Sequence, residues 1–168
     1  MIRYSFSLIF LILLGVSACN YSEEYQTVNA GNDFSVSIPG WLKTEDDLKP
    51  GAVLQYANRF RNFYMIGNTE SKEHQDISTL TNRYLNVLKQ SMKNPVVTDS
   101  MSVIINGLPG IRTEVYGKMN DENIYFSELV IEGKKNSFYH LSIWTRGEDR
   151  KLRFKKDIDR ILNSFKEI

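Results

Sequence analysis

The chain has 168 residues with 21 basic and 20 acidic side chains, so its formal net charge is +1. A chain of this length forms one domain by default. Hydrophobic residues make up 42% and charged residues 24% of the sequence, a composition that excludes a largely disordered protein. The near-zero charge balance argues against a general nucleic-acid binder, and we expect no nucleic-acid partner.

The first 18 residues have the order of a secretory signal peptide. Arg3 is their only charged residue, an apolar run follows over residues 6–14, and small residues end the segment. The run is shorter than the roughly 20 apolar residues that a membrane-spanning helix needs. The sequence therefore predicts export of the chain to the cell envelope.

The end of this segment, Val16-Ser17-Ala18-Cys19, resembles the lipobox of bacterial lipoproteins. The resemblance implies that the Cys19 thiol takes a diacylglycerol, that the chain is cut before it, and that the new amine is acylated. Two or more acyl chains anchor a protein stably, so we expect a membrane attachment through acylated Cys19. An ordinary cleaved signal peptide is the alternative.

The rest of the chain divides into a short tether and one α+β domain. We predict that residues 19–32 are the lipidated cysteine and a polar tether, and that residues 33–168 form the domain. The alternation of Phe34, Val36 and Ile38 with serines predicts a half-buried strand. Further strands are predicted over residues 52–58, 63–69, 96–98, 102–105, 111–118, 123–132 and 137–145.

Two helices are predicted from apolar residues at helical spacing. Asp76 is a suitable N-cap for a helix over residues 77–92. A second helix is expected from about Glu148 to the end of the chain. Its apolar stripe consists of Phe154, Ile158, Ile161, Leu162, Phe165 and Ile168.

In this order the elements resemble the PsbP-like family, whose fold is shared with the Ran-binding protein Mog. The matching features are Phe34-Ser35-Val36-Ser37-Ile38-Pro39 followed by Trp41, the middle helix, the long meander, and Ile161-Leu162-Asn163-Ser164-Phe165-Lys166. The resemblance implies an α/β/α sandwich, in which a central and mostly antiparallel sheet carries helices on both faces. It also implies a binding or assembly role, because the known members are mostly accessory proteins without shared catalytic residues.

No motif of enzymatic or cofactor chemistry occurs in the sequence. Phosphate-binding glycine loops, nucleophile elbows and paired zinc ligands are absent, so we expect no enzyme activity, no cofactor and no metal site. A hydrolase whose triad assembles only in space is a further alternative, because a triad has no fixed order in the sequence.

The meander predicts a candidate ligand or partner face. Two-residue turns at 120–121 and 134–135 would place three cross-strand rows on one face of the sheet. These rows are Arg112–Leu129–His140, Glu114–Ser127–Ser142 and Tyr116–Tyr125–Trp144. Polar groups beside aromatic rings are typical of ligand pockets. The alternative is a helix that covers this face, and a register slip of one residue would exchange the two faces.

A basic cluster stands at the start of the last helix. It consists of Arg150, Lys151, Arg153, Lys155 and Lys156, and is a candidate contact for anionic head groups or an acidic partner. A solvated helix face is the alternative. Together these features predict an envelope lipoprotein that binds a protein partner or assists assembly. A carrier of a small or lipidic ligand is the alternative function.

Overall fold

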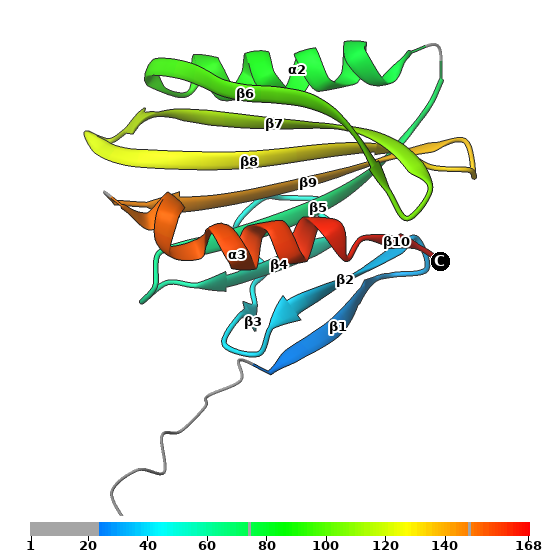
Figure 1. The fold of residues 1–168 in the computed structure, drawn as a ribbon, viewed down its shortest axis with the longest axis horizontal. Coiled ribbons are helices and arrows are strands. Elements are labelled where there is room, and N and C mark those ends of the chain that lie inside the picture. Colours follow the sequence, from blue (N-terminus) through cyan, green and yellow to red (C-terminus); the bar gives the residue numbers. More distant parts are fainter. Residues whose placement is uncertain (1–23, 74, 148) are drawn as a thin grey trace, which may run out of the picture.

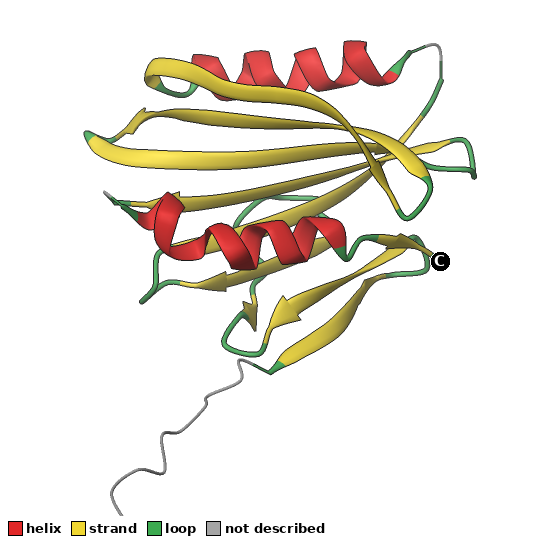
Figure 2. Ribbon diagram, in the orientation of Figure 1, coloured by secondary structure: helices red, strands yellow, loops and turns green. Residues whose placement is uncertain are grey.

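The computed structural model describes residues 24–73, 75–147 and 149–168 of the chain. The predicted signal peptide at residues 1–18 and the lipobox cysteine Cys19 lie outside the described residues, as do Glu148 and the side chain of Arg150. The described part contains two antiparallel sheets and two α-helices, which Figure 2 distinguishes by colour.

The larger sheet has seven strands in the order β3-β4-β5-β9-β8-β7-β6. Their bounds are β3 Lys43–Thr44, β4 Leu54–Asn58, β5 Phe63–Ser71, β6 Lys93–Ile105, β7 Leu108–Met119, β8 Glu122–Glu132 and β9 Ser137–Arg146. All neighbouring strands are antiparallel. The two short strands that we expected before residue 106 are one long strand, β6, whose pairing with β7 contains two register shifts.

The smaller sheet has the order β1-β2-β10 and uses both ends of the described chain. Its strands are β1 Tyr25–Ala30, β2 Phe34–Pro39 and β10 Lys166–Glu167. The tether prediction is wrong for residues 25–30, which form β1. Ala30 is fully buried and Val28 packs against the core, but the polar residues beside them in the sequence hide this pattern. The last helix also ends earlier than expected, because β10 pairs with β2.

The two helices lie on opposite faces of the larger sheet. Helix α2 (Ile77–Gln90) begins as predicted, since the Asp76 carboxylate accepts a 2.7 Å hydrogen bond from the Thr79 amide. Helix α3 (Arg150–Asn163) ends at Ser164, whose hydroxyl oxygen accepts a 2.7 Å hydrogen bond from the Ser37 amide of β2. Figure 1 shows α3 and the small sheet together, with α2 at the other side of the molecule. The predicted fold class, with a mostly antiparallel sheet and helices on both faces, is confirmed.

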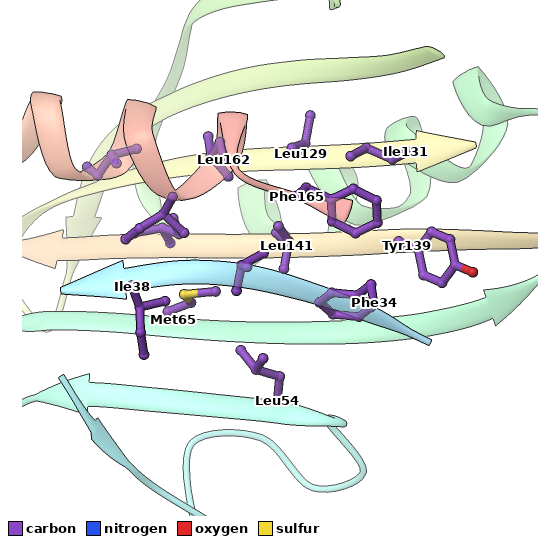
Figure 3. Packing of buried hydrophobic residues seen from close by; sticks show 14 of the residues in the cluster. Phe34, Ile38, Leu54, Met65, Leu129, Ile131, Tyr139, Leu141, Leu162 and Phe165 are labelled. Atoms are coloured by element: carbon purple, nitrogen blue, oxygen red, sulfur yellow. The ribbon is translucent and has the colours of Figure 1, made fainter. Parts of the chain in front are cut away.

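The main core lies between the larger sheet and the layer formed by α3 and β2. Figure 3 shows Phe34 and Ile38 of β2 and Phe165 after α3 packed onto this sheet face. The residues that it labels on the larger sheet are Leu54, Met65, Leu129, Ile131, Tyr139 and Leu141. The predicted apolar stripe of α3 is buried except for Ile168. Burial of this stripe fixes which side chains of α3 remain exposed.

Candidate functional site

The first hairpin of the meander has the predicted register. Asn120 and Asp121 both have positive φ values, 51° and 64°, as a two-residue type I′ turn requires. Strand β7 therefore pairs with β8 so that Glu114 lies opposite Ser127 and Tyr116 lies opposite Tyr125. This part of the predicted face is present.

The second hairpin differs from the prediction by one residue. The Gly133 amide donates a 2.9 Å hydrogen bond to the Ser137 carbonyl, and Asn136 has a positive φ of 55°. The loop therefore has three residues, 134–136, instead of the expected two. As a result Glu128 pairs with Ser142, a residue that we expected opposite Ser127.

This shift of one residue divides the predicted ligand face between the two sides of the sheet. Successive side chains of a strand point to opposite faces of the sheet. A register shift of one residue therefore moves the predicted β9 side chains to the other face. The residues that move to the α2 side are His140, Ser142 and Trp144. Those that remain on the α3 side are Arg112, Glu114, Tyr116, Tyr125 and Ser127. The eight residues do not form one site.

On the α2 side, Glu128 is the centre of a buried polar cluster. One of its carboxylate oxygens is hydrogen-bonded to His140 Nε2, and the other accepts a 2.5 Å hydrogen bond from the Ser142 hydroxyl. The ring of Tyr84 from α2 stacks on the His140 ring, with centroids 3.6 Å apart. The Tyr84 hydroxyl in turn donates to Glu70. Burial is the main cause that raises the pKa of Tyr84, and the hydrogen bond to Glu70 raises it further. The hydroxyl therefore stays protonated.

This cluster does not have the arrangement of a catalytic triad. A nucleophilic serine must donate its proton to the histidine, and the acidic residue must contact the other side of the imidazole. Here Ser142 donates to Glu128 directly, and among the described side chains none is hydrogen-bonded to His140 Nδ1. Its hydrogen bonds satisfy the buried Glu128 carboxylate and the Ser142 hydroxyl beneath α2. Trp144 lies nearby in an aromatic stack with Tyr64 and Phe126.

On the α3 side, β7 and α3 are joined by alternating charges. Arg112 contacts Asp159 of α3 at 2.7 Å and Glu114 at 3.1 Å. Lys151 donates a 2.8 Å hydrogen bond to Glu114 and lies 5.0 Å from the ring centroid of Tyr125. Ser127 is completely buried beneath this network. The network adds paired charges to the apolar packing that holds α3 against the sheet.

The pKa values in this network follow from the pairing. Burial alone would raise the pKa of Glu114, but hydrogen bonds from Lys151 and Tyr125, together with the nearby positive charges, lower it below its ordinary value. The pKa of Asp159 is also lowered, because hydrogen bonds from Lys155 and Arg112 outweigh its burial. Both carboxylates are therefore ionised at neutral pH.

Beyond this network, β6 and β7 expose a strip of the sheet. Helix α3 lies over β8 and β9 and beside β2, and Figure 1 shows β6 and β7 extending past it. We call this surface the β6–β7 strip and define it as the exposed Val96, Met101 and Tyr116 together with the largely buried charges of Arg112 and Glu114. Val96, Met101 and Tyr116 are 55%, 46% and 37% exposed, respectively. The strip thus combines apolar and aromatic surface with paired charges.

Sequence reasoning found the β7 half of the strip and missed its β6 half. Val96 and Met101 are five positions apart, so in a regular strand they would point to opposite faces. The register shift between Val97 and Asp99 inserts one residue and brings them to the same face, opposite Tyr116 and Arg112. No residue type in this segment indicates that bulge.

The predicted basic cluster is also divided by the structure. Lys151 pairs with Glu114 of β7, and Lys155 pairs with Asp159 one turn further along α3. The Arg153 guanidinium lies 5.4 Å from the Phe154 ring centroid, and Lys156 is exposed. The four described basic side chains of this cluster therefore do not form one surface patch, and of these four Arg153 and Lys156 take no part in the charge network.

Within residues 24–73, 75–147 and 149–168, no three histidine, cysteine or acidic side chains come together as a metal site. In the same ranges, neither helix is long and apolar enough to cross a bilayer.

Comparison with family models and with curated proteins finds no match to the sequence. Solved structures do match. Cyanobacterial PsbP (CyanoP) from Synechocystis sp. PCC 6803 has a TM-score of 0.64 at 14% identity, covering 93% of this chain and 99% of that chain. The chain has a PsbP/Mog1-like fold.

Two further structures have the same fold. The Ran-binding protein Mog1p of Saccharomyces cerevisiae has a TM-score of 0.62 at 10% identity, covering 86% of this chain and 96% of that chain. LpqN, involved in cell envelope biogenesis of Mycobacterium tuberculosis, has a TM-score of 0.60 at 9% identity, covering 86% and 90%. At these identities the likeness concerns the fold alone.

Proposed function

We propose that the protein is an envelope lipoprotein, anchored through acylated Cys19, that acts as a non-enzymatic binding or assembly accessory. The observation that carries the binding role is the β6–β7 strip, which we propose as the contact surface for a protein partner. It includes part of the edge strand β6, and its exposed apolar side chains lie next to the charge network.

The composition of the strip suits protein recognition. Aromatic residues, methionine and arginine are enriched in protein interfaces relative to the rest of the surface. Tyr116, Met101 and Arg112 supply these three types within neighbouring cross-strand pairs. Arg112 is already oriented by Asp159 and Glu114, so little side-chain freedom is lost when a partner binds.

The anchor and the accessory role have separate support. The lipobox-like segment Val16-Ser17-Ala18-Cys19 supports the anchor. Mog1p is a Ran-binding protein and LpqN is involved in cell envelope biogenesis, so proteins of this fold do take binding and envelope roles. The buried Ser142 and His140, which do not pair with each other, favour a non-enzymatic role. The ligand-carrier alternative assumed that the eight residues of the predicted ligand face lie on one side of the sheet. They lie on two sides, so this alternative has less support.

Site-specific photo-cross-linking in native membranes tests the binding surface. A photoreactive amino acid at position 101 or 116 should label one common protein, and the same group at Val87 should not. Val87 is a matched control because it is an exposed apolar residue, 63% accessible, on α2. The labelled protein, once identified and purified, should bind wild type and Val87→Asp but lose affinity for Met101→Asp. Equal labelling from all three positions, or no labelling from 101 and 116, would overturn the proposed surface.

The anchor is tested by mass spectrometry and by fractionation of the full-length protein. We expect wild type to carry acyl chains on Cys19 and to remain with membranes after washing in high salt. The Cys19→Ala variant should carry none and should be released. A wild-type protein without acyl chains would overturn the anchor.

A further inference from the structure

Two of the most exposed apolar side chains lie at one end of the domain. Phe60, in the turn between β4 and β5, is 96% exposed, and Leu152, in the first turn of α3, is 74% exposed. Both turns adjoin Trp41. The Arg61 guanidinium, next to Phe60, lies 4.6 Å from the Trp41 ring centroid, and the Phe154 ring of α3 lies 5.7 Å from it.

The described chain also enters the fold at this place. The Gly40 amide, which precedes Trp41, donates a 2.7 Å hydrogen bond to the Glu24 carbonyl. Tyr25 is held against α3, because its hydroxyl donates to Asp157 and the Arg160 guanidinium lies 3.6 Å from its ring centroid. The start of β1 is therefore fixed beside α3 and Trp41.

Only residues 20–24 separate Cys19 from this fixed point. A fully extended chain spans about 3.3–3.6 Å per residue, so Cys19 and Tyr25 are at most about 22 Å apart. If Cys19 carries acyl chains, this end of the domain must stay close to the bilayer. The inference that follows rests on the proposed lipid anchor.

We infer that Phe60 and Leu152 insert into the membrane interface, and that Arg153 and Lys156 contact anionic lipid head groups beside them. Apolar side chains bordered by basic residues are the usual composition of a surface that lies on a bilayer. We call this surface the membrane face and define it as Phe60, Leu152, Arg153 and Lys156.

The turn that carries Phe60 is held in shape by polar contacts. The Asn58 side-chain oxygen accepts a 2.9 Å hydrogen bond from the Arg61 amide. Arg59 pairs with Glu45 and Asp47 at 2.9 and 2.6 Å. A fixed turn presents Phe60 to the lipid without a further loss of backbone freedom on binding.

The membrane face and the β6–β7 strip would then serve different contacts. Strands β3 and β4 form one edge of the larger sheet and β6 forms the other. In Figure 1 the start of β1 and the β6 strand lie on opposite sides of the molecule. Docking through the membrane face therefore leaves the β6–β7 strip open to a partner in the aqueous compartment.

Spin labels on the full acylated protein test this orientation. Cys19 is the only cysteine of the chain, and its thiol is blocked when acylated, so each introduced cysteine is the sole labelling site. Labels are placed at Phe60→Cys and Leu152→Cys, with Ile104→Cys as the control, because Ile104 of β6 is 70% exposed. The protein is reconstituted in vesicles of phosphatidylethanolamine and phosphatidylglycerol.

We expect labels at 60 and 152 to be shielded from a water-soluble nickel reagent and accessible to oxygen, and the label at 104 to show the reverse. Raised salt in the otherwise unchanged labelled protein, or Arg153→Gln/Lys156→Gln at low salt, should return the first two labels toward water, because each weakens the head-group contacts. If all three labels on acylated protein are equally open to nickel, the membrane face is wrong and the anchor stands. If mass spectrometry finds no acyl chains on Cys19, the proposed anchor fails, and the inference fails with it.

Discussion

The Ser142 hydroxyl and the Glu128 carboxylate, a directly opposed pair on β9 and β8, are joined by a 2.5 Å hydrogen bond in the interior. The same carboxylate is bonded to His140, so Glu128→Ala leaves two buried polar groups without their acceptor. Each unsatisfied buried group costs about 1–3 kcal/mol, and we expect a loss of about 3 kcal/mol in the free energy of unfolding. Urea denaturation measures this loss. Glu122→Ala, at the exposed start of β8, is the control. Equal stabilities of the two variants would contradict the structural role of Glu128.

The charge network between β7 and α3 predicts a loss of stability in acid. The folded pKa of Glu114 lies below its ordinary value of 4.5, and that of Asp159 lies below 3.8. A lowered folded pKa contributes stability that is present above the ordinary pKa and is lost as the pH falls through the folded value. We therefore expect unfolding free energy to decline below about pH 4.5.

Replacing one carboxylate isolates its part of this acid effect. The Glu114→Gln variant should be less stable than wild type at pH 7. Its free energy of unfolding should also decline less steeply as the pH falls below about 5. Chemical denaturation at a series of pH values gives both slopes. Glu122→Gln should keep the wild-type slope, because Glu122 is exposed. A slope unchanged by Glu114→Gln would show that the pairing with Lys151 does not lower its pKa.

The loop that sets the second hairpin depends on one left-handed residue. Asn136 has a φ of 55°, a conformation that asparagine and glycine tolerate and β-branched residues do not. We expect Asn136→Gly to keep the stability of the protein, and Asn136→Val to lose about 1–2 kcal/mol. Thermal denaturation of the two variants compares a residue without a Cβ atom and a β-branched residue at the same position. Equal stabilities would mean that residue 136 does not fix the three-residue loop.

Much of the fold could be predicted from apolar periodicity and from turn residues. Phe34, Val36 and Ile38 are buried in β2 as their alternation indicates, and Asp76 caps α2. These features are local, so each is visible within a few residues. The sequence does not indicate strand β1, because backbone hydrogen bonds pair it with β2 and few of its side chains are apolar.

The candidate site could be predicted only in part, because it depends on register. A Gly-Lys-Lys-Asn segment permits a two-residue or a three-residue loop, and the choice decides which face receives His140 and Ser142. The bulge near Asp99 likewise decides that Met101 joins Val96 on the β6–β7 strip. Asn136 permits the three-residue loop through its left-handed conformation. The choice between the possible registers also depends on packing across the whole sheet, which a short sequence segment does not reveal.

The close approach of β2 to the larger sheet depends on Gly67 of β5. A Cβ at this position would lie 2.8 Å from Phe34 Cζ and 3.3 Å from Leu54 Cβ. The Phe34 ring has little room to move, because it is fully buried between the rings of Tyr139 and Phe165 at centroid distances of 5.5 and 5.2 Å. We expect Gly67→Ala to cost about 1–3 kcal/mol through overpacking.

A double-mutant cycle separates overpacking at Gly67 from other effects of the added methyl group. The Phe34→Leu change shortens the ring that the new Cβ would meet, at its own cost in stability. In that background Gly67→Ala should cost clearly less than in wild type, because residues in contact have non-additive effects. Urea denaturation of the four proteins gives the coupling energy. A coupling energy near zero would mean that Phe34 is not the side chain that forces glycine at position 67.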